Sequence, residues 1–325
     1  MLPTLLFLSW SLVFLQVETD GDIREAFHLL EAEGPVAALK WVEAQGKTPY
    51  QFASNLRKSG KHALALKWSV AMIKVSTGQK KAKFFFSKAW THYRLGEMEQ
   101  AVEDGFTLLE VGPNKSIEAN THYMLAMIFS DQEQYDNSYE HFLTAEQIYT
   151  ELERMDDVFL CVLGLAEIEI LKRNYEKGKN YLSQSLQMKT NHSKGRVHDL
   201  ESVMYFQKAE YHLSILASQK AIEEYERKNN LHNILWQNIR IGLCHALLGN
   251  FGDAYDFAAE NDAIAQKEDN LVAGYYNSIT WMLMDRCQGY EYRESRKMML
   301  DWAKHNKSKH IKDLLLLVES VSCPP

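Results

Sequence analysis

The stretch FFFSKAWTHYRLGEMEQAVEDGFTLLEVGP, residues 84–113, contains two apolar segments separated by one glycine turn. Apolar residues recur at spacings of three and four from Phe84 to Leu95 and again from Met98 to Glu110, which is the periodicity of an amphipathic helix. Gly96 separates the segments, and Gly112-Pro113 follows the second, as expected where helices end. The stretch therefore predicts two short helices joined by a tight turn.

This arrangement recurs every 36–40 residues along the chain. Its clearest marker is a small residue early in the second helix of each pair, hereafter the reference residue of that pair. The reference residues are Ala65, Ala101, Ser138, Gly178, Ala217 and Ala254. Most of them follow another small residue by twelve positions and a bulky residue by three, and Gly60, Gly96 and Gly249 precede three of them by five. Short helices pack closely where one offers a small residue to the other, and a single pair cannot bury its apolar face, so the pairs must stack.

These positions resemble the tetratricopeptide repeat over residues 47–305, and the best matches are Ala89…Gly96…Met98…Ala101…Leu108…Pro113 and Gly242…Gly249…Phe251…Ala254…Ala258. The family repeat is usually about 34 residues long, and the repeats of this chain are longer. The pair of Ala217 departs from the pattern, because Tyr205 stands where a small residue is expected. The resemblance implies an all-α superhelix, or solenoid, of about seven helix pairs. The alternative is a non-repetitive α-helical domain.

The segments flanking the repeats are predicted to be helical as well. Residues 20–46 are expected to form an N-terminal helix pair, with Pro35 at the first position of its second helix, where proline is well tolerated. Residues 306–325 are expected to form a capping helix, Ile311–Val321, and a tail. We therefore expect a solenoid that is capped at both ends.

Residues 1–19 begin with an apolar stretch that carries no charged side chain up to Val17. Its length suits the core of a signal peptide better than a membrane span of about 20 residues. However, no Lys or Arg precedes it and no A-x-A-like cleavage site follows it. We expect export to the periplasm or the cell exterior, with the segment cleaved or kept as an apolar anchor. The alternative is a buried first helix in a cytoplasmic protein. No other segment is expected to contact a membrane.

The composition and motifs argue against several classes of function. A net charge of −7 over 325 residues disfavours nucleic-acid binding, and the lysines around Phe84 (Lys74, Lys80, Lys81, Lys83 and Lys88) are interpreted as a solvated loop. The chain has no phosphate-binding loop, nucleophile elbow or paired metal-ligand motif, so we expect no enzyme activity, no metal and no cofactor. Its four cysteines show no dense framework, so a disulfide scaffold is not indicated.

Binding is the better-supported activity. The resemblance implies that the first helix of each pair lines a concave groove, at positions 18, 15, 11 and 8 residues before the reference residue. The candidate partner-binding residues are Lys47, Tyr50, Arg57, Lys83, Phe86, Trp90, Tyr93, Asn120, Tyr123 and Met127, and Ser54 and Ser130 complete the set. Aromatic side chains with scattered cations suit an extended peptide or an acidic segment. Tyr50 and Ser54, or Phe86 and Trp90, stand where the family's carboxylate clamp needs Lys and Asn, so a chaperone-tail ligand is not expected.

These observations predict a non-enzymatic protein-interaction scaffold that binds a peptide or a partner protein in the groove. Two alternatives remain. The first is a signalling regulator that responds to a peptide. The second is an inhibitor or immunity-type protein that caps a toxin or an enzyme.

Overall fold

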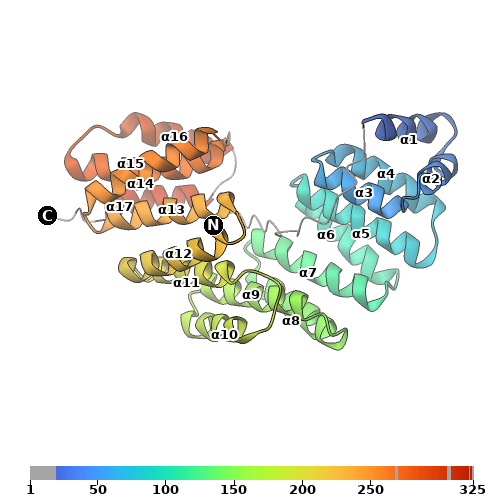
Figure 1. The fold of residues 1–325 in the computed structure, drawn as a ribbon, viewed down its shortest axis with the longest axis horizontal. Coiled ribbons are helices and arrows are strands. Elements are labelled where there is room, and N and C mark those ends of the chain that lie inside the picture. The colour runs from blue at the N-terminus through green and yellow to red at the C-terminus, as the bar shows by residue number, and fades with distance from the viewer. Residues whose placement is uncertain (1–19, 268–269, 306–308, 322, 324–325) are drawn as a thin grey trace. The chain divides into compact units, whose positions relative to one another are not determined.

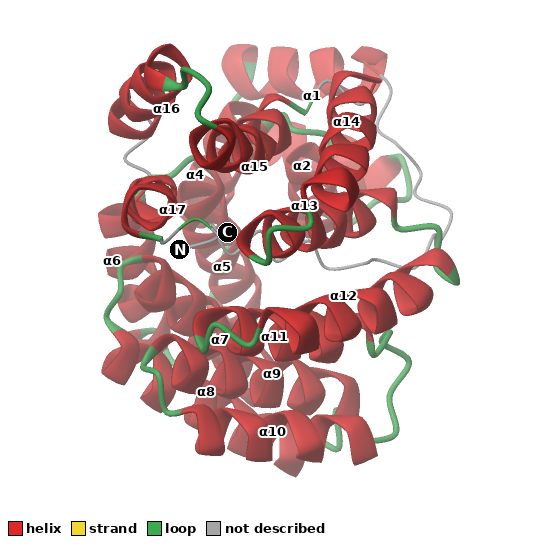
Figure 2. Ribbon diagram, turned by 90° about the vertical axis from the view of Figure 1, so that its left-hand side faces the viewer, coloured by secondary structure: helices red, strands yellow, loops and turns green. Residues whose placement is uncertain are grey.

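The computed structural model describes residues 20–267, 270–305, 309–321 and 323. In this part of the chain the secondary structure consists of 17 helices without a strand (Figures 1 and 2). The all-α fold class is thereby confirmed. The predicted signal peptide or apolar anchor, residues 1–19, lies outside the described residues. No helix within the described residues combines the length and the hydropathy needed to span a bilayer.

The chain forms two compact units that meet within one helix, the first up to Ile168 and the second from Glu169 onward. The helices of the N-terminal unit are α1 (Asp20–Ala32), α2 (Pro35–Ala44), α3 (Pro49–Lys58), α4 (His62–Val75), α5 (Gly78–Arg94), α6 (Met98–Glu110), α7 (Lys115–Asp131), α8 (Tyr135–Glu151) and the first part of α9 (Met155–Leu171). Those of the C-terminal unit are the rest of α9, α10 (Tyr175–Gln187), α11 (Gly195–Gln207), α12 (Tyr211–Glu226), α13 (Leu231–Leu247), α14 (Phe251–Lys267), α15 (Leu271–Gln288), α16 (Arg293–His305) and α17 (Lys309–Ser320).

Each unit is a stack of helix pairs of the predicted kind (Figure 1). In the N-terminal unit α3 packs on α4, α5 on α6 and α7 on α8, and the first helices α3, α5 and α7 also contact one another in order. In the C-terminal unit the same holds for α11 with α12, α13 with α14, and α15 with α16. At the two ends of the chain, α2 packs on α3 and α4, and α17 packs on α15 and α16.

The small residues mark the close contacts, as the repeat pattern predicts. All six reference residues are buried, and Ala65, Ala101, Ser138 and Ala254 have no exposed surface. The second helices α4, α6, α8, α10 and α14 all begin three residues before their reference residue. The hydroxyl of Ser138 also donates a hydrogen bond of 2.7 Å to the backbone carbonyl of Ala126, twelve residues earlier. The small residue thus brings the second helix against the backbone of the first.

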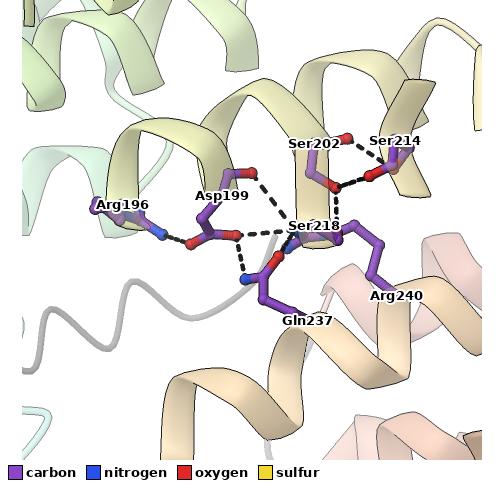
Figure 3. A network of polar contacts seen from close by, with 7 residues as sticks. All are labelled: Arg196, Asp199, Ser202, Ser214, Ser218, Gln237 and Arg240. Atoms are coloured by element: carbon purple, nitrogen blue, oxygen red, sulfur yellow. Dashed lines mark hydrogen bonds and ion pairs between the residues drawn. The ribbon is translucent and has the colours of Figure 1, made fainter. Parts of the chain in front are cut away.

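The register predicted for the fifth of these pairs, the one assigned to Ala217, is wrong by three residues. Helix α12 begins at Tyr211, which makes Ser214 the reference residue and Ser202 its small partner twelve positions earlier. Both serines are fully buried, and each hydroxyl donates to the other residue's backbone carbonyl, at 2.9 and 3.0 Å (Figure 3). Serine replaces alanine here because its hydroxyl finds a backbone partner inside the contact.

The turn inside each pair places one residue in the left-handed region, five positions before the reference residue. Gly60, Gly96 and Gly249 occupy this position in three pairs, as predicted. Glu133, Arg173 and Ala209 occupy it in the others, with φ of 61°, 62° and 58°. The turn is therefore the same in these six pairs, and three of them form it with a residue that carries a Cβ.

Replacing Ala209 by glycine is expected to stabilise the protein. An L-residue in the left-handed region costs about 1–2 kcal/mol, which the larger chain entropy of glycine offsets only in part, so a gain of about 0.5–1 kcal/mol is expected. Ala209 is exposed, so its methyl group is not part of the core. Urea unfolding of Ala209→Gly checks the gain, and Gly96→Ala, at φ 79°, is the matched control that should lose stability. An unchanged or lower midpoint for Ala209→Gly would contradict the prediction.

The C-terminal helix is also held covalently, which the cysteine spacing did not indicate. Cys287, at the end of α15, forms a disulfide with Cys323, which follows α17. The neighbouring Arg286 donates to the backbone carbonyls of Val321 and Glu319, at 2.8 and 3.1 Å. Cys161 and Cys244 are free and buried, in line with the apolar helical patterns around them. The chain therefore has one covalent link among the described residues, and it fixes α17 to α15.

Candidate partner-binding surface

An aromatic row runs along one face of α5, because Phe86, Trp90 and Tyr93 recur at helical spacing. The rings of Phe86 and Trp90 stack with centroids 6.1 Å apart, and the Tyr93 ring meets Trp90 edge-on at 5.7 Å. Phe86 and Trp90 are partly exposed, whereas Tyr93 is buried. We call Phe86, Trp90 and Tyr93 the aromatic surface. It lies on a first helix, where the repeat pattern predicted contact with a partner.

One end of the aromatic surface is fixed by the next helix pair. The Tyr93 hydroxyl donates a hydrogen bond of 2.8 Å to the carboxylate of Asp131, at the end of α7. Burial and the charge of Asp131 raise the pKa of Tyr93 well above its usual value, so the phenol stays protonated and remains a donor. Trp90 therefore packs against a ring that is held in place.

The predicted residues of α3 and its preceding turn face different partners. The ammonium group of Lys47 lies 3.2 Å from the carboxylate of Asp22 on α1, so its charge is neutralised within the chain. Arg57 extends from α3 to α5, where its guanidinium donates to the hydroxyl and the backbone carbonyl of Ser87. The Tyr50 hydroxyl lies beside the same guanidinium. Arg57 and Tyr50 are therefore brought next to the aromatic surface, and Lys47 is paired with α1.

The predicted residues of α7 are mostly internal. Tyr123 and Met127 are 8% and 4% exposed, and the Tyr123 ring packs edge-on against Phe142 of α8 at 5.6 Å. Asn120 accepts a hydrogen bond of 2.7 Å from the Tyr149 hydroxyl. Ser130 is buried as well, and Ser54 on α3 is half-buried. In α7 the pattern thus selects side chains that pack within the unit.

The predicted lysine-rich loop is a helix. Helix α5 begins at Gly78, six residues before the expected start at Phe84, and it carries Lys80, Lys81 and Lys83 in its first turns. Lys83 is exposed on the same side as Phe86, three residues earlier, while Lys88 is paired with Asp104 at 2.6 Å. Lys83 consequently supplies an exposed positive charge beside the aromatic surface.

A buried polar network in the C-terminal unit went undetected in the sequence (Figure 3). The carboxylate of Asp199 on α11 accepts hydrogen bonds from three side chains. Arg196 of the same helix donates at 2.5 Å, and Arg240 and Gln237 of α13 each donate at 2.8 Å. Burial raises the pKa of Asp199, but the charges of Arg240 and Arg196 and the hydrogen bond from Gln237 outweigh it and lower the pKa to about 2. The network therefore contains one buried carboxylate and two guanidinium groups.

The corrected register places two members of this network at predicted groove positions. Counted from Ser214, Arg196 and Asp199 lie 18 and 15 positions earlier, which are the positions that Lys83 and Phe86 occupy in the second pair. Groove residues were predicted only for the first three pairs, so these two residues were not among the candidates. In the fifth pair this face serves to join α11 to α13.

Two half-buried histidines form a further polar pair, between α7 and α8. The Nδ1 atoms of His122 and His141 are 2.8 Å apart, and the His141 ring stacks on Phe129 at 5.3 Å. Burial, and then the nearby charge of His122, lowers the pKa of His141 to about 4, so the pair is neutral near pH 7. Within the described ranges no group of three or more His, Cys, Asp or Glu residues is arranged to hold a metal ion.

The comparisons with known proteins concern the fold. No protein-family model and no curated protein matches the chain. Among solved structures, the apo quorum sensor NprR from B. thuringiensis is similar with a TM-score of 0.65 and 12% identity, over 92% of this chain and 90% of that one. Apo RapI is similar with a TM-score of 0.55 and 13% identity, over 92% of this chain and 95% of that one.

A signal transduction ATPase with a tetratricopeptide repeat sensor, from Pyrococcus horikoshii, is similar with a TM-score of 0.64 and 17% identity. The match covers 90% of this chain and 48% of the ATPase, so the chain spans about half of that protein's length. At these identities the likeness concerns architecture alone. Together with the buried reference residues and the repeated turn, it shows that the chain has a helical-repeat fold of the tetratricopeptide type.

Proposed function

We propose that the chain is a non-enzymatic protein-interaction scaffold that binds an extended peptide segment of a partner on the aromatic surface of α5. The observation that carries the proposal is the partly exposed Phe86–Trp90 stack on a first helix, held against the buried Tyr93. Such rings offer a large contact area at a low cost in side-chain entropy, which is why aromatic residues dominate the energetics of interfaces. The Tyr93–Asp131 hydrogen bond favours binding further, because a surface ordered in advance loses less entropy on association.

A peptide-responsive signalling regulator is the second candidate. The observation that favours it is the similarity in fold to a quorum sensor and to the tetratricopeptide repeat sensor of a signal transduction ATPase. In such a regulator the bound peptide would alter the packing between helix pairs. The binding surface would be the same in both candidates, so the experiment below applies to either.

We also propose that the protein works outside the cytoplasm. The support is the disulfide between Cys287 and Cys323, because such bonds persist in oxidising compartments and are rare where thiols are kept reduced. The apolar composition of residues 1–19, which is typical of the core of an export signal, agrees with this proposal. A role in the cell envelope or outside the cell follows for the scaffold.

Replacing Trp90 by alanine is expected to weaken peptide binding at least tenfold, as for a central aromatic hot spot. The probes are peptides selected on the wild-type chain from a displayed random library, and the affinity is measured by titration with each purified variant. Phe86→Ala should have the same direction of effect. The matched control is Phe106→Ala, which removes an aromatic ring that is 43% exposed on the second helix α6.

All three variants should keep the helical content of the wild type by circular dichroism, because the rings at issue are partly exposed. If Trp90→Ala binds the peptide with wild-type affinity and Phe106→Ala binds it less tightly, the binding site lies on the second helices instead. If no displayed peptide is selected by the wild-type chain, the proposal fails.

A further inference from the structure

Arg57 is a partly buried cation whose partners in the described part of the chain are all neutral. Its guanidinium donates to the hydroxyl and the backbone carbonyl of Ser87, with the Tyr50 hydroxyl beside it. Two other partly buried arginines differ: Arg240 lies 2.8 Å from the carboxylate of Asp199, and Arg154, just before α9, lies 2.8 Å from that of Asp157. A buried charge without a counter-charge is costly, so its retention needs an explanation.

A second observation points to the same place. His62 is the first residue of α4, and its Nδ1 atom is buried without a hydrogen-bond partner. Burial, and then the positive charges of Arg94 and Arg57, lowers the pKa of His62. The N-terminal end of α4, where Lys61 makes no side-chain cap, adds the positive end of the helix dipole. Arg57, His62 and this helix end together make a locally positive site.

We propose that Arg57 and His62 form a carboxylate-binding subsite for an internal Asp or Glu of the peptide that binds the aromatic surface. The inference rests on the proposed function and names the chemistry of its ligand. Ser87, which accepts from the guanidinium, is fully buried and lies between Phe86 and Trp90 along α5, so Arg57 reaches this helix at a level between the two rings. A peptide that contacts both rings would pass this level with its middle. A side-chain carboxylate of the peptide is then in reach, rather than its C-terminal end.

The energetics favour this ligand. A carboxylate that accepts hydrogen bonds from a guanidinium gains more than a neutral amide does, because charge-assisted bonds are shorter and stronger. The carboxylate would also supply the counter-charge that Arg57 lacks in the free chain. The same reasoning has a consequence for the free protein. A neutral side chain at position 57 removes an uncompensated charge, so it should cost no stability.

The experiment uses the full chain and pools of acetylated, amidated nonapeptides with degenerate flanks and a fixed central residue, either Asp, Asn or phosphoserine. The wild-type chain is expected to enrich the Asp pool over the Asn pool by about tenfold, the value of one charge-assisted contact. Arg57→Gln should lower this ratio to about one, and His62→Gln should lower it severalfold. Lys80→Gln, which removes an exposed charge from the first turn of α5, is the control that should keep most of the preference.

The results separate this inference from the proposed function. Trp90→Ala should reduce capture of the Asp and Asn pools equally. If the wild-type chain captures both pools equally and Trp90→Ala loses both, the proposed function stands and the carboxylate subsite is wrong. Equal or absent enrichment in the wild type, an unchanged ratio in Arg57→Gln, or a preference for the phosphoserine pool over the Asp pool would each overturn the inference. The melting temperature of Arg57→Gln should equal or exceed that of the wild type. A clear decrease would assign Arg57 a structural role. In that case the ratio of Asp-pool to Asn-pool capture by His62→Gln decides the inference.

Discussion

The Asp199→Ala variant is expected to lose about 3–5 kcal/mol of unfolding free energy, the usual cost of removing one partner from a buried ion pair. The carboxylate of Asp199 accepts from Arg240 and Gln237 of α13, both at 2.8 Å, and from Arg196 of its own helix. Without it, the guanidinium of Arg240, whose side chain is 10% exposed, loses its counter-charge, and Arg196 loses its contact at 2.5 Å. The same contacts join α11 to α13, so their loss also weakens the packing between neighbouring helix pairs.

Urea unfolding at neutral pH measures this loss. Asp199→Asn keeps the shape and part of the hydrogen bonding, so it should fall between the wild type and Asp199→Ala. The matched control is Asp253→Ala, since this carboxylate is 64% exposed and lies 3.6 Å from His245. Its removal should change the stability by less than about 0.5 kcal/mol. A loss in Asp199→Ala as small as that of the control would show that the network contributes nothing.

The pH dependence gives an independent signature of Asp199. Its pKa is lowered to about 2 in the folded protein, against about 3.9 in an unfolded chain. A carboxylate with a depressed folded pKa stabilises the protein above its unfolded pKa, and the contribution is lost as the pH falls through the folded pKa. The stability difference between the wild type and Asp199→Ala should therefore be complete above about pH 4 and shrink between about pH 4 and pH 2.

The fold could be predicted because its determinants are local. A small residue such as Ala101 or Ala254 marks a close contact between two helices, and the residue five positions earlier marks the turn that joins them. The prediction missed the register at Ser214 because a serine in a helix is an ambiguous signal. Only the structure reveals that its hydroxyl bonds to the backbone of Ser202 and is thereby as compatible with close packing as a methyl group. Ala209 gave no signal of its left-handed backbone for a similar reason, since alanine rarely adopts it.

The candidate site was only partly predictable, because its exposure depends on neighbouring pairs. The same helix position holds a partly exposed Phe86 in α5 and a buried Tyr123 in α7. The difference lies in what each ring meets: Tyr123 packs on Phe142 of its own pair, whereas Phe86 stacks on Trp90 of the same helix. Contacts of this kind join residues far apart in the sequence, so the repeat pattern alone selects the face of a helix and not the exposure of its side chains.

The disulfide at the C-terminus is expected to give the second large effect. Replacing Cys323 by serine should lower the free energy of unfolding by about 3–4 kcal/mol, the loop-entropy value for a bond that joins residues 36 positions apart. The bond fixes the end of α17 to α15, and α17 contributes Leu314, Leu315 and Val318 to the core of the C-terminal unit. Arg286 donates to carbonyls at and just after the end of α17 independently of the bond, so the helix should remain attached but open more often.

Hydrogen exchange locates this effect as well as measuring it. In Cys323→Ser the amides of α17 should lose protection, while those of α5 in the N-terminal unit should be unchanged. Cys287→Ser and the double variant should match Cys323→Ser, because each removes the same bond. When the unreduced protein is denatured and labelled, two free thiols should be found, those of Cys161 and Cys244. All four cysteines should be labelled only after reduction. Four free thiols without reductant would remove both the expected stabilisation and the main support for a function outside the cytoplasm, since the same bond carries both arguments.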